Sequence, residues 1–102
     1  VRVRQRLLKI VWSPQARLDL QQIYRHILPD SPKAARQLQE RIRECILLST
    51  ETPQIGRPGR VPGTREMVIS GTCYIVPYRI VSNTLQILRV YHTARQWPET
   101  FE

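Results

Sequence analysis

The sequence predicts a single α+β domain, residues 1–102, in which one antiparallel sheet packs on a helical hairpin and the elements follow the order β-α-α-β-β-β. Two observations carry this prediction. Apolar residues recur at helical spacing in two stretches, each preceded by Ser-Pro, and three β-rich runs separated by very short turns follow them. The 102 residues, 41% of them hydrophobic and 24% charged, suit one folded core.

A short strand is predicted over residues 7–12, because alternation there places Leu8, Ile10 and Trp12 on one face. Ser-Pro follows it directly and occurs again after residue 30. A serine hydroxyl can cap a helix, and proline suits the first helical position, where its missing N–H would have no partner. The first helix is expected from Ser13-Pro14 to Pro29, and the second begins at Ser31-Pro32. The apolar stripes are Ala16, Leu20, Ile23, Tyr24 and Ile27 in the first helix, and Ala35, Leu38, Ile42, Cys45 and Ile46 in the second.

The segment "TPQIGRPGRVPGT", residues 52–64, contains three prolines and three glycines and is expected to be a loop with a basic tip. Strands are expected over residues 65–70, 73–81 and 84–92, joined by turns short enough for an antiparallel meander. Pro77 lies inside the middle strand. Because proline cannot donate to a neighbouring strand, that strand is expected to have an open edge or a bulge at this point.

Charge is the most informative part of the composition. The chain has 16 Lys and Arg against 8 Asp and Glu, for a formal net charge of +8, and only two of the cations are lysines. Arginine binds phosphates and carboxylates through a planar fork of donors. The charge therefore favours an anionic partner, either nucleic acid or an acidic protein, over the third possibility of a merely solvated basic surface.

Other features exclude several classes of protein. The sequence has no apolar run long enough to span a membrane and no signal-peptide core, so a cytoplasmic protein without membrane contact is expected. Cys45 and Cys73 are too few for a disulfide framework or a zinc site, and both are expected to be buried, reduced thiols. No metal or other cofactor is expected.

Three segments, "RVPGTREMVI", "YIVPYRI" and "ILRVYHTARQWP", together with the order of elements, resemble the RelE/ParE superfamily of toxins from bacterial type II toxin–antitoxin modules. The resemblance extends from about Lys9 to Pro98. It implies a toxin that a cognate antitoxin neutralises through an acidic, partly disordered segment. ParE-like toxins of this superfamily poison DNA gyrase, whereas RelE-like toxins cleave mRNA in the ribosomal A site.

His92 is the candidate catalytic residue if the chain is a nuclease, because metal-free RNA cleavage needs a general acid or base. The alternative is a strand-end histidine bonded to backbone or to a carboxylate. The resemblance disfavours a nuclease, since Ile75 occupies the position of a phosphate-binding arginine in similar RelE-type enzymes. His26 is assigned a surface or capping role. The sequence is therefore closer to ParE, with a RelE-like mRNA endonuclease as the alternative.

Six further residues are predicted to contact nucleic acid or another target: Arg60, Arg65, Arg79, Arg89, Tyr91 and Arg95. Antitoxin docking or plain solvation remain alternatives for the loop arginines. With a two-residue turn at residues 82–83, Tyr74 should face Tyr91 and Cys73 should face His92. That register would place Tyr74, Val76, Tyr78, Arg89 and Tyr91 on one face and Cys73, Ile75, Arg79, Val90 and His92 on the other. Trp97 is expected to pin the C-terminal tail onto the domain.

Overall fold

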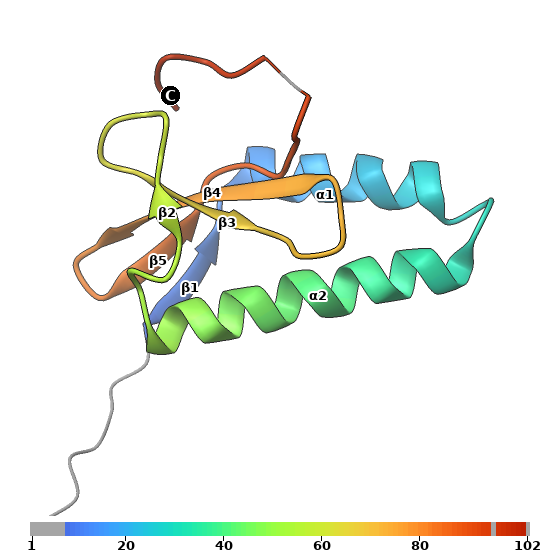
Figure 1. Ribbon diagram of the computed structural model, residues 1–102, viewed down its shortest axis with the longest axis horizontal. Helices are drawn as coiled ribbons and strands as arrows, with labels where there is room; N and C mark the ends of the chain where they lie inside the picture. The colour runs from blue at the N-terminus through green and yellow to red at the C-terminus, as the bar shows by residue number, and fades with distance from the viewer. Residues whose placement is uncertain (1–7, 95, 102) are drawn as a thin grey trace, which may run out of the picture.

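The computed structural model describes residues 8–94 and 96–101, and it confirms the predicted α+β class: two helices pack against a mixed six-stranded sheet (Figure 1). The helices are α1 (Pro14–Ile27) and α2 (Pro32–Glu51). The strands are β1 (Lys9–Trp12), β2 (Arg57–Pro58), β3 (Arg65–Val68), β4 (Tyr74–Val81), β5 (Thr84–Ile87) and β6 (Tyr91–His92). Leu7, with which the predicted first strand began, lies outside the described residues.

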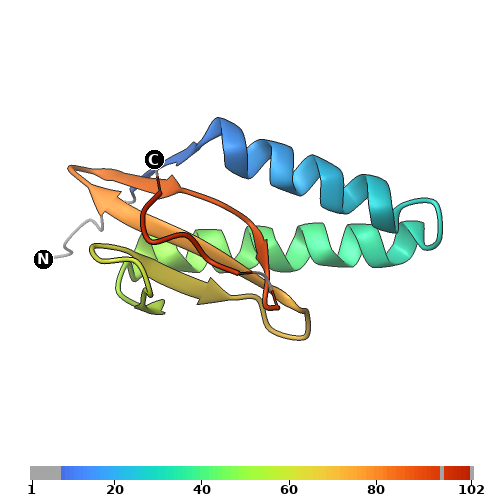
Figure 2. The same ribbon diagram turned by 90° about the horizontal axis from the view of Figure 1, so that it is seen from above.

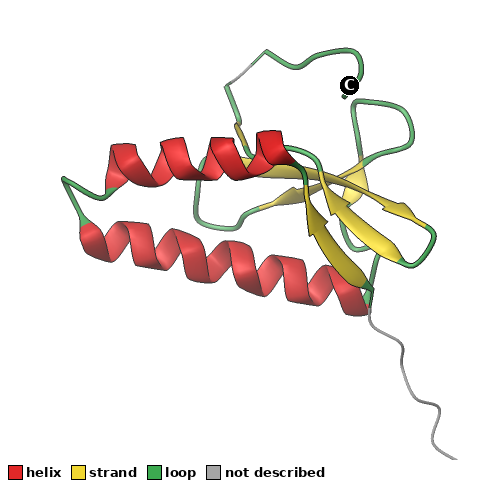
Figure 3. Ribbon diagram, turned by 180° about the vertical axis from the view of Figure 1, so that it is seen from behind, coloured by secondary structure: helices red, strands yellow, loops and turns green. Residues whose placement is uncertain are grey.

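Both helices begin as their Ser-Pro pairs predict. The hydroxyl of Ser13 accepts a hydrogen bond from the Ala16 N–H at 3.0 Å, and that of Ser31 accepts one from the Ala34 N–H at 3.1 Å. Each hydroxyl thereby satisfies an amide that has no partner within its helix. Figure 3 shows the two helices side by side and extending past the end of the sheet.

The sheet has the strand order β1-β5-β4-β3-β2, with β6 also pairing with β4. The antiparallel meander β3-β4-β5 is confirmed, and Val81 faces Thr84 across the predicted two-residue turn. At one edge, however, β1 pairs with β5 in parallel, so the expectation of a wholly antiparallel sheet was wrong there. A strand that leads into helices has no hairpin turn to fix its direction, so no local motif predicts this parallel pairing.

The predicted loop over residues 52–64 also contains one short strand. In β2, Arg57 pairs with Glu66 and Pro58 pairs with Arg65. Proline is tolerated here because β2 is an edge strand, where no further strand needs its missing N–H. The loop is thus fixed to the sheet at its middle.

The main core lies between the helices and one face of the sheet. Tyr78 belongs to this core and is fully buried; its hydroxyl donates to the Pro53 carbonyl at 2.8 Å and accepts from the Gly56 N–H at 3.0 Å. The other core residues are apolar side chains of both helices, of β3 to β5 and of the segments that follow β3 and β5, chiefly Ala16, Leu38, Ile42, Ile46, Met67, Ile69, Val76, Leu85, Ile87 and Val90. Most of the predicted helical stripes therefore face the sheet.

A bulge interrupts the pairing of β4 beside Pro77. The Leu88 N–H donates to the Pro77 carbonyl, whereas farther along Tyr91 pairs with Ile75. Val76 on β4 therefore faces two residues, Arg89 and Val90, which is the pattern of a β-bulge. Of the two alternatives considered for Pro77, the structure has the bulge.

The bulge makes the predicted facing of β6 wrong by one residue. Tyr74 pairs with His92 instead of Tyr91, and Tyr91 pairs with Ile75. Because side chains alternate along a strand, this shift moves Tyr91 to the face of Ile75 and Arg79, and moves His92 to the face of Tyr74. The candidate site residues are thereby redistributed between the two faces.

Candidate functional site

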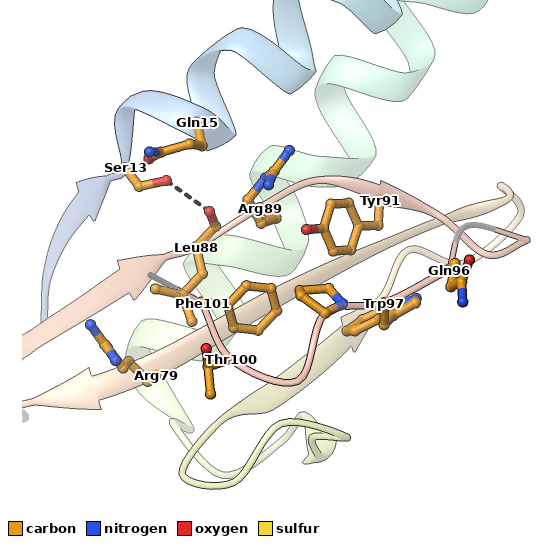
Figure 4. Close-up of a pocket in the computed structure, with 11 residues that line it drawn as sticks. Ser13, Gln15, Arg79, Leu88, Arg89, Tyr91, Gln96, Trp97, Thr100 and Phe101 are labelled. Atoms are coloured by element: carbon orange, nitrogen blue, oxygen red, sulfur yellow. Dashed lines mark hydrogen bonds between the residues drawn. The ribbon is translucent and has the colours of Figure 1, made fainter.

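The face of the sheet that points away from α2, here called the outer face, is covered by the C-terminal segment, residues 96–101, and by the loop that precedes β3 (Figures 1 and 2). A cavity of about 600 Å³ lies beneath the C-terminal segment. Its walls include Arg79, Arg89, Tyr91, Trp97 and Phe101, and no described residue that lines it is a carboxylate (Figure 4). The cavity is therefore basic and aromatic.

Arg89 follows β5 in the bulge, and Asp19 of α1 holds it in place. Its Nε and Nη2 atoms donate to the two carboxylate oxygens of Asp19 at 2.7 and 2.8 Å, and the same carboxylate accepts the Val90 N–H at 3.0 Å. The hydrogen bond to Asp19 is the main reason that the pKa of Arg89 is raised. The positive charge of Arg89 is thus largely compensated inside the molecule.

Three aromatic rings attach the C-terminal segment to the outer face. Tyr91 is 1% exposed, and the Trp97 ring meets it edge-on at a centroid distance of 5.1 Å. Phe101 lies 6.2 Å from Tyr91 and 6.4 Å from Trp97. The guanidinium of Arg89 also lies over the Tyr91 ring, 4.7 Å from its centre, in a cation–π contact. This packing agrees with the role expected for Trp97.

Glu66 holds Arg60, which lies in the loop before β3, through hydrogen bonding. The Glu66 carboxylate is 1% exposed and accepts from the Arg60 N–H at 2.8 Å, while its other oxygen lies 2.9 Å from Nη2 of Arg57. The Arg60 guanidinium in turn lies 4.1 Å from the centre of the Trp97 ring. The loop arginine is therefore joined to the C-terminal segment that roofs the cavity.

The other two described arginines of the predicted set differ in their surroundings. Arg65 donates to the carbonyls of Gln54 and Gly56, at 3.3 and 2.8 Å, and so ties the loop to β3. Arg79 is exposed at the cavity wall, where its Nε donates to Gln86 at 2.8 Å. Arg79 therefore offers the cavity a positive charge that no carboxylate contact described in the structure offsets.

His92 lies apart from this cavity. It is exposed, its Nδ1 accepts the Ala94 N–H at 3.1 Å, and its ring meets the Tyr74 ring edge-on at 5.7 Å. With His26 it lines a separate hollow of about 310 Å³ that has no arginine among its described lining residues. The backbone contact matches the structural alternative considered for His92. Arg95, also predicted as a contact, lies outside the described residues.

The structure thus brings together Arg79, Arg89 and Tyr91 and links Arg60 to them through Trp97. It does not place His92 or Arg65 in that group. Sequence reasoning missed Asp19, Glu66 and Phe101. One signal was available for Glu66, since it is the only Asp or Glu between residues 52 and 98, a stretch that contains six arginines.

Cys45 is partly buried, but Cys73 is exposed, so the expectation of two buried thiols was wrong for Cys73. Cys73 lies in the turn directly before β4 and outside the strand. Over residues 8–94 and 96–101, no cluster of three or more His, Cys, Asp or Glu side chains could hold a metal ion. Neither described helix is long and apolar enough to cross a membrane.

The fold matches a class of small proteins known from solved toxin–antitoxin systems. A chain of the chromosomal ParDE toxin–antitoxin system from P. aeruginosa superimposes with a TM-score of 0.75 at 27% identity, covering 84% of this chain and 96% of that one. A chain of the RelBE2 toxin–antitoxin complex from Mycobacterium tuberculosis gives a TM-score of 0.60 at 25% identity, covering 85% and 99%.

Sequence comparison narrows this class to one family. The sequence model of the ParE toxin of the type II toxin–antitoxin system parDE matches residues 10–97, and the chain belongs to this family. It is also 41% identical over 91 residues to the Sinorhizobium fredii protein named "Putative toxin Y4kP", covering 89% of this chain and 94% of that protein. The RelE/ParE assignment made from three sequence segments is confirmed, and it is closer to ParE.

Proposed function

We propose that this ParE-family toxin inhibits growth by binding DNA gyrase in the cytoplasm, without catalysing a reaction, and that a cognate acidic antitoxin neutralises it. The observation that carries the proposal is the separation of His92 from the arginines. Arg79, Arg89 and Tyr91 gather at the cavity under the C-terminal segment, whereas His92 lines a different hollow. This arrangement favours a contact surface over an active site.

Cleavage of RNA through its 2′-OH needs an acid or base and, within reach of the same phosphate, a cation that stabilises developing charge. Ile75, at the position where the resemblance would place such a cation, is 3% exposed and apolar. Arg89 is committed to Asp19 by two short hydrogen bonds. The described residues near His92 therefore supply an imidazole without a phosphate clamp.

Antitoxin binding is supported by charge and by the comparisons. The net charge of +8 and the predominance of arginine suit an acidic segment, whose carboxylates the guanidinium forks can bind. The solved chains that this toxin resembles come from toxin–antitoxin systems. We expect good yield only when an acidic antitoxin is co-expressed. We also expect association to slow as salt screens the long-range attraction.

A RelE-like mRNA endonuclease is the second candidate. It is favoured by the exposure of His92, whose Nε2 makes no hydrogen bond described in the structure, and by the aromatic ring of Tyr74 beside it. In that case His92 would act as the general acid or base. The likeness to a RelBE2 chain is compatible with this candidate.

One induction experiment separates the two candidates. The toxin is expressed without antitoxin, and transcript integrity and chromosome supercoiling are measured within minutes, before secondary effects of growth arrest. We expect intact transcripts with altered supercoiling and DNA damage. Rapid mRNA cleavage with unchanged supercoiling would instead support the endonuclease, and growth without harm would contradict both.

A further inference from the structure

Glu66 is the most deeply buried charged side chain among the described residues of the outer face. It sits on β3 with 1% of its side chain exposed, and its carboxylate lies between two arginines that are about half exposed, Arg57 and Arg60. Oε1 accepts from Nε of Arg57 at 3.0 Å, and Oε2 accepts from the backbone N–H of Arg60 at 2.8 Å. A buried carboxylate normally persists only when it is paired and hydrogen-bonded, as here.

The two arginines that bind this carboxylate differ in their other contacts. Arg57 belongs to β2 and pairs with Glu66 across the strand edge. Arg60 contacts Glu66 through its backbone N–H and, at 3.6 Å, through its Nε, and its guanidinium lies over the Trp97 ring at 4.1 Å. Glu66 is therefore connected to the C-terminal segment through Arg60 and not through Arg57.

We infer that Glu66 is a positioning residue that couples the basic loop to the C-terminal segment: it fixes Arg60, and Arg60 holds Trp97 and with it the roof of the cavity. A carboxylate at this position sets both the backbone and the side chain of Arg60. Neutralising it leaves the guanidinium free to leave the indole for solvent. The consequence for toxicity rests on the proposed function, but the coupling itself does not.

Hydrogen exchange of the C-terminal segment tests the coupling without any target. Glu66→Gln should raise amide exchange in residues 96–101 by about two- to fivefold, the change that corresponds to one cation–π contact at a partly exposed site. Arg60→Ala should do the same. Because Glu66 acts through Arg60, the double variant should resemble either single variant instead of showing the product of the two effects. Protection of β4 amides reports whether the sheet remains folded.

Arg57→Ala is the matched control, because it removes a partner of the same carboxylate that does not touch Trp97. We expect unchanged exchange of residues 96–101 in this variant. A C-terminal segment that loosens equally in Arg57→Ala, or multiplicative effects in the double variant, would overturn the coupling. Unchanged exchange in Arg60→Ala would overturn it even if Glu66→Gln failed to fold. A loosened segment in a fully toxic Glu66→Gln variant would leave the coupling intact and contradict the proposed target surface.

Discussion

Asp19 and Arg89, which lie 70 residues apart in the sequence, form a two-bond ion pair that joins the first helix to the bulge in the sheet. The same carboxylate accepts the Val90 N–H. Asp19 thus supplies a hydrogen-bond acceptor for the backbone amide of Val90, one of the two bulge residues opposite Val76. The pair thus lies between the last pairing of β5 with β4 and the pairing of Tyr91 with Ile75.

Asp19→Ala should lower the free energy of unfolding by about 2–4 kcal/mol, because it leaves the partly buried guanidinium of Arg89 without its carboxylate and an amide without its acceptor. Denaturant unfolding measures the change, and Asp30→Ala in the exposed turn between the helices serves as the control. In a double-mutant cycle Asp19 and Arg89 should be coupled by about 1–3 kcal/mol. Simple additivity would show that the pair contributes nothing.

Tyr78→Phe should cost about 1–3 kcal/mol, because the Pro53 carbonyl and the Gly56 N–H both lose a buried partner. The stabilisation should also depend on pH. Burial raises the pKa of Tyr78 in the folded protein above its ordinary value of 10.0, so the unfolded phenol ionises first as pH rises. The contribution is complete below about pH 10 and is lost as pH rises toward the folded pKa. The difference in unfolding free energy between parent and variant should therefore shrink in alkali; a constant difference would contradict this explanation.

The two cysteines should differ in reactivity. Burial raises the pKa of the Cys45 thiol, so less of it is thiolate at pH 8, and Cys73 is exposed. Iodoacetamide should label Cys73 well before Cys45 in the folded protein, as followed by mass spectrometry, and both at similar rates in denaturant. Changing both to alanine should leave toxicity intact and cost about 1 kcal/mol, mainly from the loss of partly buried Cys45. Equal labelling rates in the folded state would contradict the difference in exposure between Cys45 and Cys73.

Arg79→Ala should weaken target binding on the order of tenfold, because the cavity wall loses a guanidinium whose positive charge no described carboxylate contact offsets. Growth inhibition on induction provides the readout, and capture by the antitoxin reports folding. Arg36→Ala, an exposed arginine on α2, removes the same charge from another surface. If both variants lose toxicity equally, general charge and not the cavity determines binding.

Local signals in the sequence predicted the local structure. The two Ser-Pro pairs identified both helix starts because a cap needs only residues within one turn. The parallel pairing of β1 and the bulge beside Pro77 depend on contacts between distant segments, and no short motif specifies them. The predicted two-residue turn was right at Val81 and Thr84, yet one extra residue opposite Val76 reversed the facing beyond it.

The same difference between local signals and contacts of distant segments limited the prediction of the candidate site. Its arginines could be named from residue type, but their partners could not, because Asp19 and Glu66 reach them only in the folded chain. The predicted register also placed His92 on the same face as Arg79. The structure separates His92 because the register shift places it on the face of Tyr74.

The central claim is that this toxin acts by binding and not by catalysis, and growth inhibition by a His92→Ala variant tests it most directly. The variant is induced without antitoxin beside the parent, antitoxin capture confirms that it is folded, and transcripts are sampled within minutes. We expect most of the growth inhibition to remain, with transcripts intact in both cultures. A well-folded His92→Ala variant that no longer inhibits growth, beside a parent that cleaves mRNA at least about 100-fold faster, would contradict the account and identify His92 as the general acid or base of an endonuclease.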